Sequence, residues 1–543
     1  TASVDAAPPV AAALPVVTGW PEAGESLAVD GGTWTGTAPI ALSYQWQRCD
    51  VHGLECVDVA GATEATYVPT EDDVGATLRA TVAAANAGGT VSAASEATLR
   101  IASATGFSSR QQWPYVTGVA RFWAADAPAP PAIAIVDSGI DATRPDFGGR
   151  VVAQASLTAL TPNSPGDGRG HGTFVASIAA GEAHGYTGAA PRANLVSVDV
   201  IDDHGMAMTS DVIAAADWIY QNRDTYNIRV ANFSLQGSAP SSLQVDPVDK
   251  AVERLWQSGV VVVAAAGNYG SANGPSGVLY SPGNDPFVLT AGALDTQGTV
   301  ATGDDLTAPW SAYGHTLDGF LKPELGAPGR YIVGAVPPDS TLALERPESI
   351  VAPGYMRLSG TSFAAPVVSG AAADVLAAHP SWTPNQVKGA LMLTAAQTAD
   401  GSSLASGAGE VDAAAAADAV DPPNPNAALD QFLVADPAGG PTPVFDTTTW
   451  AATAQADPSW ATAYWGTAYW GTAYWGTAYW GTAYWGTDYW ETGSALSSSD
   501  AYWGTTSVTA TPNGAVADAL PAGAYWISAA DRVAAEGRLG LAP

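Results

Sequence analysis

The sequence predicts an α/β fold with a central parallel sheet and helices on both faces, preceded by a small all-β sandwich. Two observations predict this combination. Short alternating runs separated by turn residues fill residues 14–103, whereas apolar strands alternate with helical stretches over residues 104–420. A chain of 543 residues is also too long for one ordinary core, so we expect several domains.

The β-sandwich is expected over residues 14–103, after an N-terminal linker of residues 1–13. Its candidate strands alternate polar and apolar residues; they are Ser26–Val29, Leu42–Gln47, Ala65–Val68 and Ala76–Val82. We expect Trp46 to pack between the two sheets rather than to bind a ligand. Together with the later turn segments Gly61-Ala-Thr and Asp73-Val-Gly, the run Tyr44–Cys49 resembles bacterial immunoglobulin-like repeats of secreted and surface proteins.

The only two cysteines, Cys49 and Cys56, lie close together in this part of the chain. They lack the paired CxxC spacing of zinc sites, so we favour a local disulfide over two free thiols. A disulfide implies an oxidising compartment. Because a short loop gains little entropy from closure, this bond would pin a loop rather than hold the protein together.

Residues 104–420 show the pattern of a parallel sheet buried on both faces. The candidate strands are largely apolar: Ala132–Val136, Leu195–Val200, Ile228–Phe233, Val260–Ala264 and Phe287–Ala291. Between them, a helix is expected over Asp211–Asn222 with Ser210 as its cap. A second is expected over Val248–Gln257, with Asp246 as cap and Pro247 at the first helical position.

A linker rich in proline, alanine and aspartate follows over residues 421–458, and an aromatic tail over residues 459–543. The tail repeats Gly-Thr-Ala-Tyr-Trp, and Ala-Tyr-Trp returns at Ala501 and Ala524. An odd period turns successive Tyr-Trp pairs to opposite faces of an extended strand. The repeats are therefore either a self-packing or disordered spacer, which we favour, or a module that contacts glycans or cell walls.

Acidic residues number 52 against 20 basic ones, for a formal net charge of -32. This charge repels nucleic acids and anionic membrane surfaces, and its simplest role is solubility. The longest strongly apolar run, Gly259–Ala266, is far shorter than the ~20 residues of a membrane helix, so no membrane span is expected. The chain begins at Thr1 without a methionine, so either a targeting segment has been removed or the sequence is a fragment.

Three motifs suggest chemistry. Asp137 ends an apolar strand in Ile135-Val-Asp-Ser-Gly, where open parallel sheets place their ligand crevice, although an aspartate there also suits a turn. His171 lies in Gly168-Arg-Gly-His-Gly-Thr, on the first turn of a predicted helix. Ser362 lies in Gly360-Thr-Ser-Phe-Ala-Ala-Pro at another helix start, where it would either cap the helix or present a reactive hydroxyl.

In the order Asp, His, Ser, these motifs resemble those of the subtilisin-like serine proteases, over about residues 105–420. The resemblance implies that residues 104–420 form a subtilisin-like catalytic domain. It also implies that Ser362 is the nucleophile, His171 the general base and acid, and Asp137 the group that orients the imidazole. The family's oxyanion asparagine falls on Asn268. The resemblance therefore implies that Asn268 and the backbone N–H of Ser362 together bind the oxyanion.

The segment Ala231–Gly237 resembles the family's substrate-binding strand, whose edge pairs with an extended peptide. The expected walls of the pocket are two short runs: Ser234, Leu235, Gln236, Gly237 and Ala264, Ala265, Ala266, Gly267. Gln236 replaces a glycine that family members often have, and Tyr280 near the pocket base would favour small side chains. The replacement at Gln236 leaves the side-chain preference open.

The resemblance implies polypeptide substrates, no cofactor for the chemistry, and a secreted or cell-surface location. Many relatives bind calcium, and Asp202, Asp203 and Asp211 are candidate ligands for a structural calcium ion, although no loop has a recognisable calcium spacing. The alternative function is a non-catalytic surface adhesin built on a protease-like core. The intact Asp137, His171, Ser362 and Asn268 argue against it, because an inert scaffold has no need of all four.

Overall fold

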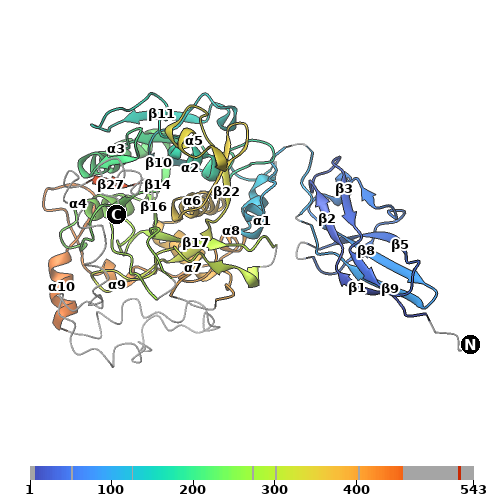
Figure 1. Ribbon diagram of the computed structural model, residues 1–543. Coiled ribbons are helices and arrows are strands. Elements are labelled where there is room, and N and C mark those ends of the chain that lie inside the picture. The colour runs from blue at the N-terminus through green and yellow to red at the C-terminus, as the bar shows by residue number, and fades with distance from the viewer. Residues whose placement is uncertain are drawn as a thin grey trace, which may run out of the picture. The chain divides into compact units, whose positions relative to one another are not determined.

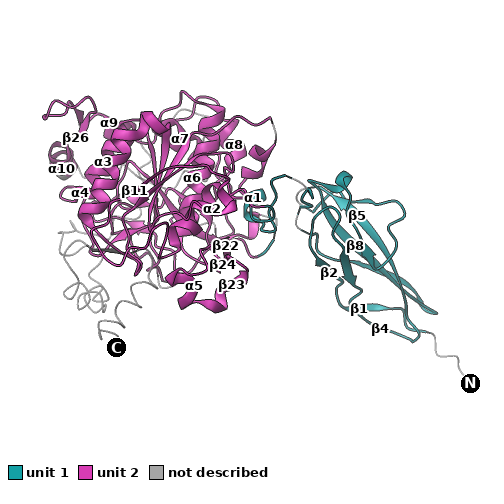
Figure 2. Cartoon of the chain, turned by 90° about the horizontal axis from the view of Figure 1, so that it is seen from above, with its two compact units in different colours: residues 1–116, 184–186, 298–301 teal, residues 117–183, 187–297, 302–543 magenta. Residues whose placement is uncertain are grey.

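The computed structural model describes residues 6–50, 53–98, 100–104, 106–124, 126–271, 274–299, 302–400, 404–456 and 524–526. The chain forms two compact units (Figure 2). One comprises residues 1–116, 184–186 and 298–301, and the other comprises residues 117–183, 187–297 and 302–543.

The named strands of the first unit all pair antiparallel, which confirms the predicted small β domain (Figure 1). Its sheets have the orders β6-β5-β8-β9, β2-β3-β7 and β1-β4. The strands are β1 (Val10–Ala13), β2 (Val16–Gly19), β3 (Leu27–Asp30), β4 (Thr33–Thr35), β5 (Ala41–Cys49), β6 (Val57–Asp58), β7 (Thr66–Tyr67), β8 (Thr77–Asn86) and β9 (Gly89–Ala94). Trp46 is fully buried among Leu27, Leu78 and Val82. Its indole N–H donates to the carbonyl of Glu64 at 3.0 Å, so Trp46 is a core residue.

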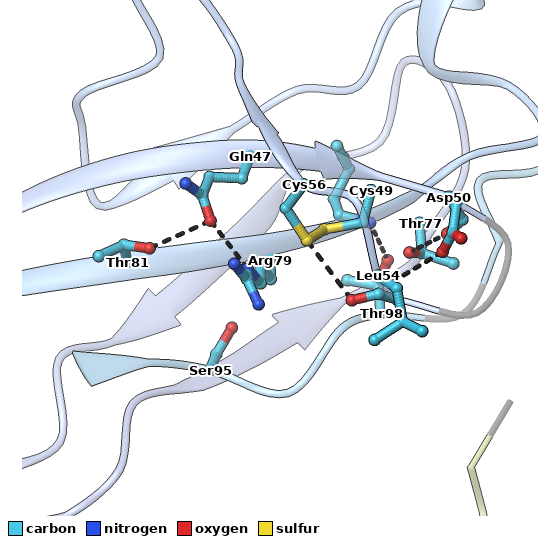
Figure 3. The surroundings of a disulfide bond; sticks show 12 residues. Gln47, Cys49, Asp50, Leu54, Cys56, Thr77, Arg79, Thr81, Ser95 and Thr98 are labelled. Atoms are coloured by element: carbon cyan, nitrogen blue, oxygen red, sulfur yellow. Dashed lines mark hydrogen bonds between the residues drawn. A yellow bond between two sulfur atoms is a disulfide. The ribbon is translucent and has the colours of Figure 1, made fainter. Parts of the chain in front are cut away.

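Cys49 and Cys56 form the predicted local disulfide (Figure 3). The bond ties the end of β5 to the residue before β6. Beside it, the carbonyl of Asp50 accepts a hydrogen bond from Thr77 Oγ1 at 2.8 Å, and Asp50 Oδ1 accepts one from the N–H of Leu54 at 2.7 Å. The disulfide therefore acts with these bonds to hold one end of the β5–β8 strand pair.

The second unit is an α/β structure around a mostly parallel sheet, as the sequence predicts. Within the described residues this sheet has eight strands, in the order β11-β12-β10-β14-β16-β17-β18 with β21 also paired to β17. They are β10 (Ala132–Asp137), β11 (Val151–Ser156), β12 (Leu195–Asp199), β14 (Ile228–Phe233), β16 (Val261–Ala265), β17 (Leu289–Asp295), β18 (Leu306–Thr307) and β21 (Leu325–Pro328). Only β18 pairs antiparallel. Every residue of β10, β12 and β16 is buried, which explains their continuous apolar runs.

Helices cover both faces of this sheet. In Figure 2, α3 and α4 lie on one side of it, and α2 and α6 lie on the other. The helices of this unit are α2 (His171–Ala180), α3 (Thr209–Tyr226), α4 (Pro247–Gln257), α5 (Thr341–Glu345), α6 (Thr361–Ala378), α7 (Pro384–Leu393), α8 (Ala413–Ala417), α9 (Ala427–Asp430) and α10 (Thr447–Ala456); α1 (Trp113–Val116) belongs to the first unit. By length and composition α6 could cross a membrane, but 94% of that window is buried inside the protein, as in a core helix.

One predicted cap is confirmed and one is wrong. Asp246 caps α4 by accepting hydrogen bonds from Val248 N and Asp249 N. Ser210 does not cap α3, because the helix already begins at Thr209 after Met208. The hydroxyl of Ser210 instead donates to the carboxylate of Asp211 at 3.0 Å.

Smaller sheets surround the core of the second unit. One is antiparallel, with the order β13-β27-β15, and is formed by β13 (Met206–Met208), β27 (Ala524–Trp526) and β15 (Gln236–Gly237). The others are built from β19 (Gly314–His315), β20 (Leu321–Lys322), β22 (Ile332–Ala335), β23 (Ile350–Ala352), β24 (Tyr355–Leu358), β25 (Leu433–Val434) and β26 (Val444–Phe445).

The described part of the expected linker, residues 421–456, contains α9, β25, β26 and α10. Phe445 packs edge-on against Phe287 at 5.1 Å between ring centroids, and Asn426 Nδ2 donates to the carbonyl of Phe287 at 3.1 Å. Apart from β27, the aromatic tail lies outside the described residues, so both interpretations of its repeats stay open.

Candidate active site

The candidate site lies where the chain connections of the central sheet diverge. From β10 the chain continues to β11 and β12, which extend the sheet in one direction from β10. Later it continues to β14 and β16, which extend the sheet in the other direction. Such a switch point leaves a crevice at the carboxyl ends of the strands. Asp137 is the last residue of β10 and therefore faces this position.

Asp137 and His171 are joined directly. His171 Nδ1 lies 2.8 Å from Asp137 Oδ1 and 3.0 Å from Oδ2, and both side chains are buried. Because the carboxylate can only accept, Nδ1 carries the proton and Nε2 is left as an acceptor. Nε2 is buried and has no hydrogen-bond partner among the described residues.

Gly172 allows this approach. A Cβ added at Gly172 would lie 2.1 Å from the carbonyl oxygen of Gly139 and 3.2 Å from Asp137 Cβ. Any side chain would therefore push the start of α2 away from the end of β10. This is a physical reason for glycine directly after His171.

Asp167 holds the start of α2, a role that sequence reasoning missed. Its carboxylate accepts hydrogen bonds from Gly170 N at 2.6 Å, Thr173 N at 2.7 Å and Ser138 Oγ at 2.8 Å. Burial raises the pKa of Asp167 to about 7. The hydrogen bonds favour the charged carboxylate and so oppose this rise. An aspartate four residues before the histidine, just ahead of a predicted helix, was the available signal.

Ser362 is the second residue of α6 and is buried. Its Oγ donates to the carbonyl of Ser234 at 3.3 Å, while Ser234 Oγ donates to the carbonyl of Ser362 at 2.7 Å. The ring of Phe363 packs on the imidazole of His171 at 5.5 Å between centroids. Phe363, which contacts His171, directly follows Ser362 in the sequence.

Ser362 does not cap α6. The N-cap residue is Gly360, which has no side chain to cap the helix. Instead, Asn232 Nδ2 donates to Ser234 Oγ at 2.9 Å, and Ser369 Oγ donates to Asn232 Oδ1 at 3.0 Å. These buried bonds tie β14 to α6 and fix the position of Ser362; sequence reasoning missed Asn232 and Ser369.

Asn268 is held by the same helix start. Its Oδ1 accepts hydrogen bonds from Thr361 N at 2.8 Å and Thr361 Oγ1 at 3.1 Å. Because Oδ1 is engaged, Nδ2 is the group that remains to donate. A Cβ added at Gly360 would lie 3.5 Å from Asn268 Nδ2. Since Gly360 precedes Ser362 by two residues, this donor lies close to the start of the helix that carries Ser362.

The predicted pocket residues converge. Ser234 and Leu235 are buried after β14, Gln236 and Gly237 form β15, and Ala264, Ala265 and Ala266 are buried at the end of β16. A Cβ on Gly267 would lie 2.7 Å from Gln236 Oε1, so the two expected walls adjoin. Gly237 N donates to the carbonyl of Ser281, beside Tyr280, at 2.9 Å.

Tyr269 adds a contact that the sequence did not predict. Its ring packs edge-on against Tyr280 at 4.9 Å, and its hydroxyl accepts a hydrogen bond from the N–H of Leu279 at 2.9 Å. A Cβ on Gly267 would lie 2.3 Å from this ring. Tyr269 therefore fills space between the two expected walls.

The three candidate calcium ligands do not come together in one cluster. Asp202 Oδ1 accepts from His204 N and Met206 N, Asp203 from Ser164 N and Ser164 Oγ, and Asp211 from Ala159 N and Ser210 Oγ. In the part of the chain that the structure describes, no three His, Cys, Asp or Glu side chains gather around one point. Each carboxylate instead fixes a neighbouring loop.

Comparison with known proteins identifies the family of the chain. The model of the subtilase family, peptidase S8, matches residues 130–409, just over half of the chain. Serine protease AprX from Bacillus subtilis (strain 168) is 38% identical over 265 residues, 47% of this chain and 59% of that protein. Subtilisin NAT from Bacillus subtilis subsp. natto is 36% identical over 287 residues, 52% of this chain and 65% of that protein.

The chain thus spans about three fifths to two thirds of these relatives. Subtilisin from Bacillus pumilus is 36% identical and is matched over 90% of its length. A crystal structure of a cold adapted subtilisin-like serine proteinase is 27% identical, with a TM-score of 0.42, over 54% of this chain and 95% of that chain. By the family model and the 36% identity over most of the length of subtilisin from Bacillus pumilus, the chain belongs to the subtilase family.

Proposed function

We propose that this chain is a serine endopeptidase that hydrolyses peptide bonds through an acyl-enzyme intermediate. The observation that supports this best is the buried Asp137–His171 pair, whose Nε2 is left as an acceptor next to the segment that carries Ser362. A serine hydroxyl is a weak nucleophile at neutral pH and needs such a base.

In the acylation step, Ser362 Oγ attacks the scissile carbonyl carbon and gives its proton to His171 Nε2. Asp137 stabilises the resulting imidazolium through Nδ1–H. The carbonyl oxygen becomes an oxyanion, which accepts hydrogen bonds from Asn268 Nδ2 and from the N–H of Ser362. His171 then protonates the leaving amine as the C–N bond breaks.

In the deacylation step, a water molecule gives one proton to His171 Nε2 and its oxygen attacks the acyl carbon. The acid product leaves as the proton returns to Ser362 Oγ. Every step uses side chains and backbone groups of this chain, so the chemistry needs no cofactor.

The substrates that fit this chemistry are polypeptides. We propose that Gln236, Gly267 and Tyr280 shape the pocket for the residue before the cleaved bond and favour small side chains, because Tyr280 and Tyr269 occupy the space near its base. Cleavage of a random peptide library, read by mass spectrometry, would contradict this preference if large aromatic residues dominated at that position.

A secreted or cell-surface location is part of the proposal. The disulfide Cys49–Cys56 supports it, because disulfides persist in oxidising compartments. We also propose that the first unit is an immunoglobulin-like domain, which its antiparallel sheets and the buried Trp46 support.

Fluorophosphonate labelling tests the endopeptidase proposal. The purified chain should be labelled at Ser362, with loss of the label in His171→Ala and in Ser362→Ala. It should also cut a denatured protein into fragments that the Ser362→Ala variant does not produce. A non-catalytic adhesin would show no label and no fragments, and that result would refute the proposal.

A further inference from the structure

The last Ala-Tyr-Trp segment of the chain is the middle strand of a small antiparallel sheet. Its three residues, Ala524–Trp526, form β27 between β13 and β15. Trp526 pairs with Met206 and Gln236, and Tyr525 pairs with Ala207 and Gly237. Both edges of β27 are therefore covered, although β13 and β15 lie far from it in sequence.

This sheet begins beside the candidate nucleophile. Gln236 follows Ser234 by two residues, and the carbonyl of Ser234 accepts a hydrogen bond from Ser362 Oγ at 3.3 Å. Along β15 the chain runs away from Ser362. Because β27 is antiparallel to β15, its own direction leads toward Ser362.

An extended peptide that is to be cleaved must meet the same requirements. It must pair by its backbone with the strand edge that follows Ser234, and its chain must run toward Ser362. The backbone of β27 meets both requirements. It covers the edges of β13 and β15 on which a substrate would pair.

We propose that Ala-Tyr-Trp is an intramolecular ligand of the β13 and β15 edges, which competes with polypeptide substrates. The competition rests on the proposed endopeptidase function, whereas the occupancy of the edges does not. The tail thereby regulates access to the site.

The sequence offers this ligand more than once. The same tripeptide occurs at residues 463–465, 468–470, 473–475, 478–480, 483–485 and 501–503, as well as at 524–526. Tethering gives a bound segment an effective concentration in the ~mM range. Seven tethered copies would keep the edges occupied even though a single tripeptide binds weakly.

Peptide binding to the full chain tests the occupancy. The parent is Ser362→Ala, which cannot lose its tail by self-cleavage. In the test variant the Tyr and Trp of all seven copies are also replaced by proline, which lacks the N–H that strand pairing requires. The probe is a fluorescent Ala-Tyr-Trp-Ile-Ser peptide, and its Kd is measured by anisotropy.

The test variant should bind the probe about tenfold more tightly than the parent, because the tethered competitor is gone. A control with Val508→Pro and Thr509→Pro, which alters the tail outside every copy, should match the parent. Equal Kd values for test variant and parent, or no binding to the test variant at ~mM probe, would overturn the inference.

Amide hydrogen exchange gives a second measurement. The amides of β13 and β15 should exchange faster in the test variant than in the parent, and equal rates would count against the inference. Neither measurement needs catalysis. With Ser362 restored, the seven-copy change should lower KM for a peptide substrate and leave kcat unchanged; absent turnover in both proteins would refute the endopeptidase proposal instead.

Discussion

At the scale of single residues, the reactive groups are aimed by neighbours that occupy their other polar atoms. Thr361 binds Asn268 Oδ1 and leaves Nδ2 to donate, and Asp137 binds His171 Nδ1 and leaves Nε2 to accept. The direction of each group is thereby settled before a substrate arrives. Preorganised donors of this kind need no reorientation as charge develops.

Asn268→Ala should lower kcat much more than it changes KM, because in the proposed mechanism the Nδ2 donor serves the oxyanion rather than the bound ground state. In subtilisin, loss of the corresponding donor costs about 10²–10³ in kcat, and a similar loss is expected here. Steady-state kinetics on a peptide substrate measure both constants. An unchanged kcat would remove Asn268 from the oxyanion site.

Asp167 is a positioning residue for His171. In Asp167→Asn one of the three donors that meet the carboxylate loses its acceptor, so the start of α2 loosens and kcat should fall about tenfold at constant KM. Because burial raises the pKa of Asp167 to about 7, it is charged above that pH and protonated below it.

The acid side of the kcat profile should therefore be steeper in the parent enzyme than in Asp167→Asn, which has lost this ionisation. If Asp167 had a purely structural role, Asp167→Asn would lower the melting temperature and leave the shape of the kcat profile unchanged. Asp141→Asn is the matched control, since Asp141 Oδ1 accepts hydrogen bonds from the N–H and the hydroxyl of Thr143 in an exposed turn.

At the scale of elements, the site depends on how closely two helix starts approach one strand end. α2 and α6 pack against each other, and the ring of Phe363 on α6 lies 4.6 Å from that of Phe174 on α2. Small displacements of either helix would move His171 relative to Ser362. A misplacement of ~1 Å can cost about 10² in rate.

Gly172→Ala tests this spacing. The added Cβ would meet the carbonyl of Gly139 at 2.1 Å, so α2 must shift away from β10. We expect kcat/KM to fall by about 10² or more while circular dichroism stays that of a folded protein. Gly303→Ala, where a Cβ meets nothing within 4 Å, is the control and should keep full activity. Normal activity in Gly172→Ala would show that the spacing is not critical.

At the scale of the whole molecule, buried charges join segments that are distant in sequence. Glu324 Oε1 lies 2.7 Å from Lys322 Nζ and 2.9 Å from Lys388 Nζ, and all three side chains are buried. Asp305 and Glu410 are also buried. Among the described residues, none of their four carboxyl oxygens has a hydrogen-bond partner, and each of the two groups shifts the pKa of the other.

Burial raises the pKa of Asp305 to about 6, and burial together with Asp305 raises the pKa of Glu410. Both values lie above those of the unfolded chain, so the fold binds extra protons. The contribution of Asp305 to stability is fully present below pH ~4 and is lost as the pH rises through about 6, and the contribution of Glu410 is lost in the same direction. The pair therefore weakens the fold at neutral pH.

Glu410→Gln should relieve this loss, because its amide N–H can donate to the Asp305 carboxylate without an added proton. We expect a melting temperature about 1 °C above the parent at pH 8, equivalent to about 1 kcal/mol in a unit of this size, and no gain at pH 5. Asp339→Asn removes an exposed charge and should show no such pH dependence. A gain of the same size at both pH values would show that the ionisation of Asp305 and Glu410 is not the cause.

Much of the fold could be predicted because its signals are local. The apolar run Ala132–Val136 is a strand because both faces of the sheet are covered, and Asp246-Pro247 starts a helix through contacts within one turn. The Ser210 cap was wrong because helix starts one or two residues apart have nearly equal local energies. Asp167, Asn232 and Tyr269 were missed because their partners come from other parts of the chain.

The sequence by itself determined the alternation of strands and helices, the local disulfide and the four motif residues, since these depend on residue type and short-range order. Only the tertiary structure decided which partners those residues meet: Thr361 for Asn268, Ser234 for Ser362, and β13 and β15 for Ala524–Trp526. The physical reason is that hydrogen bonds and packing act over a few ångströms in space, whatever the separation along the chain.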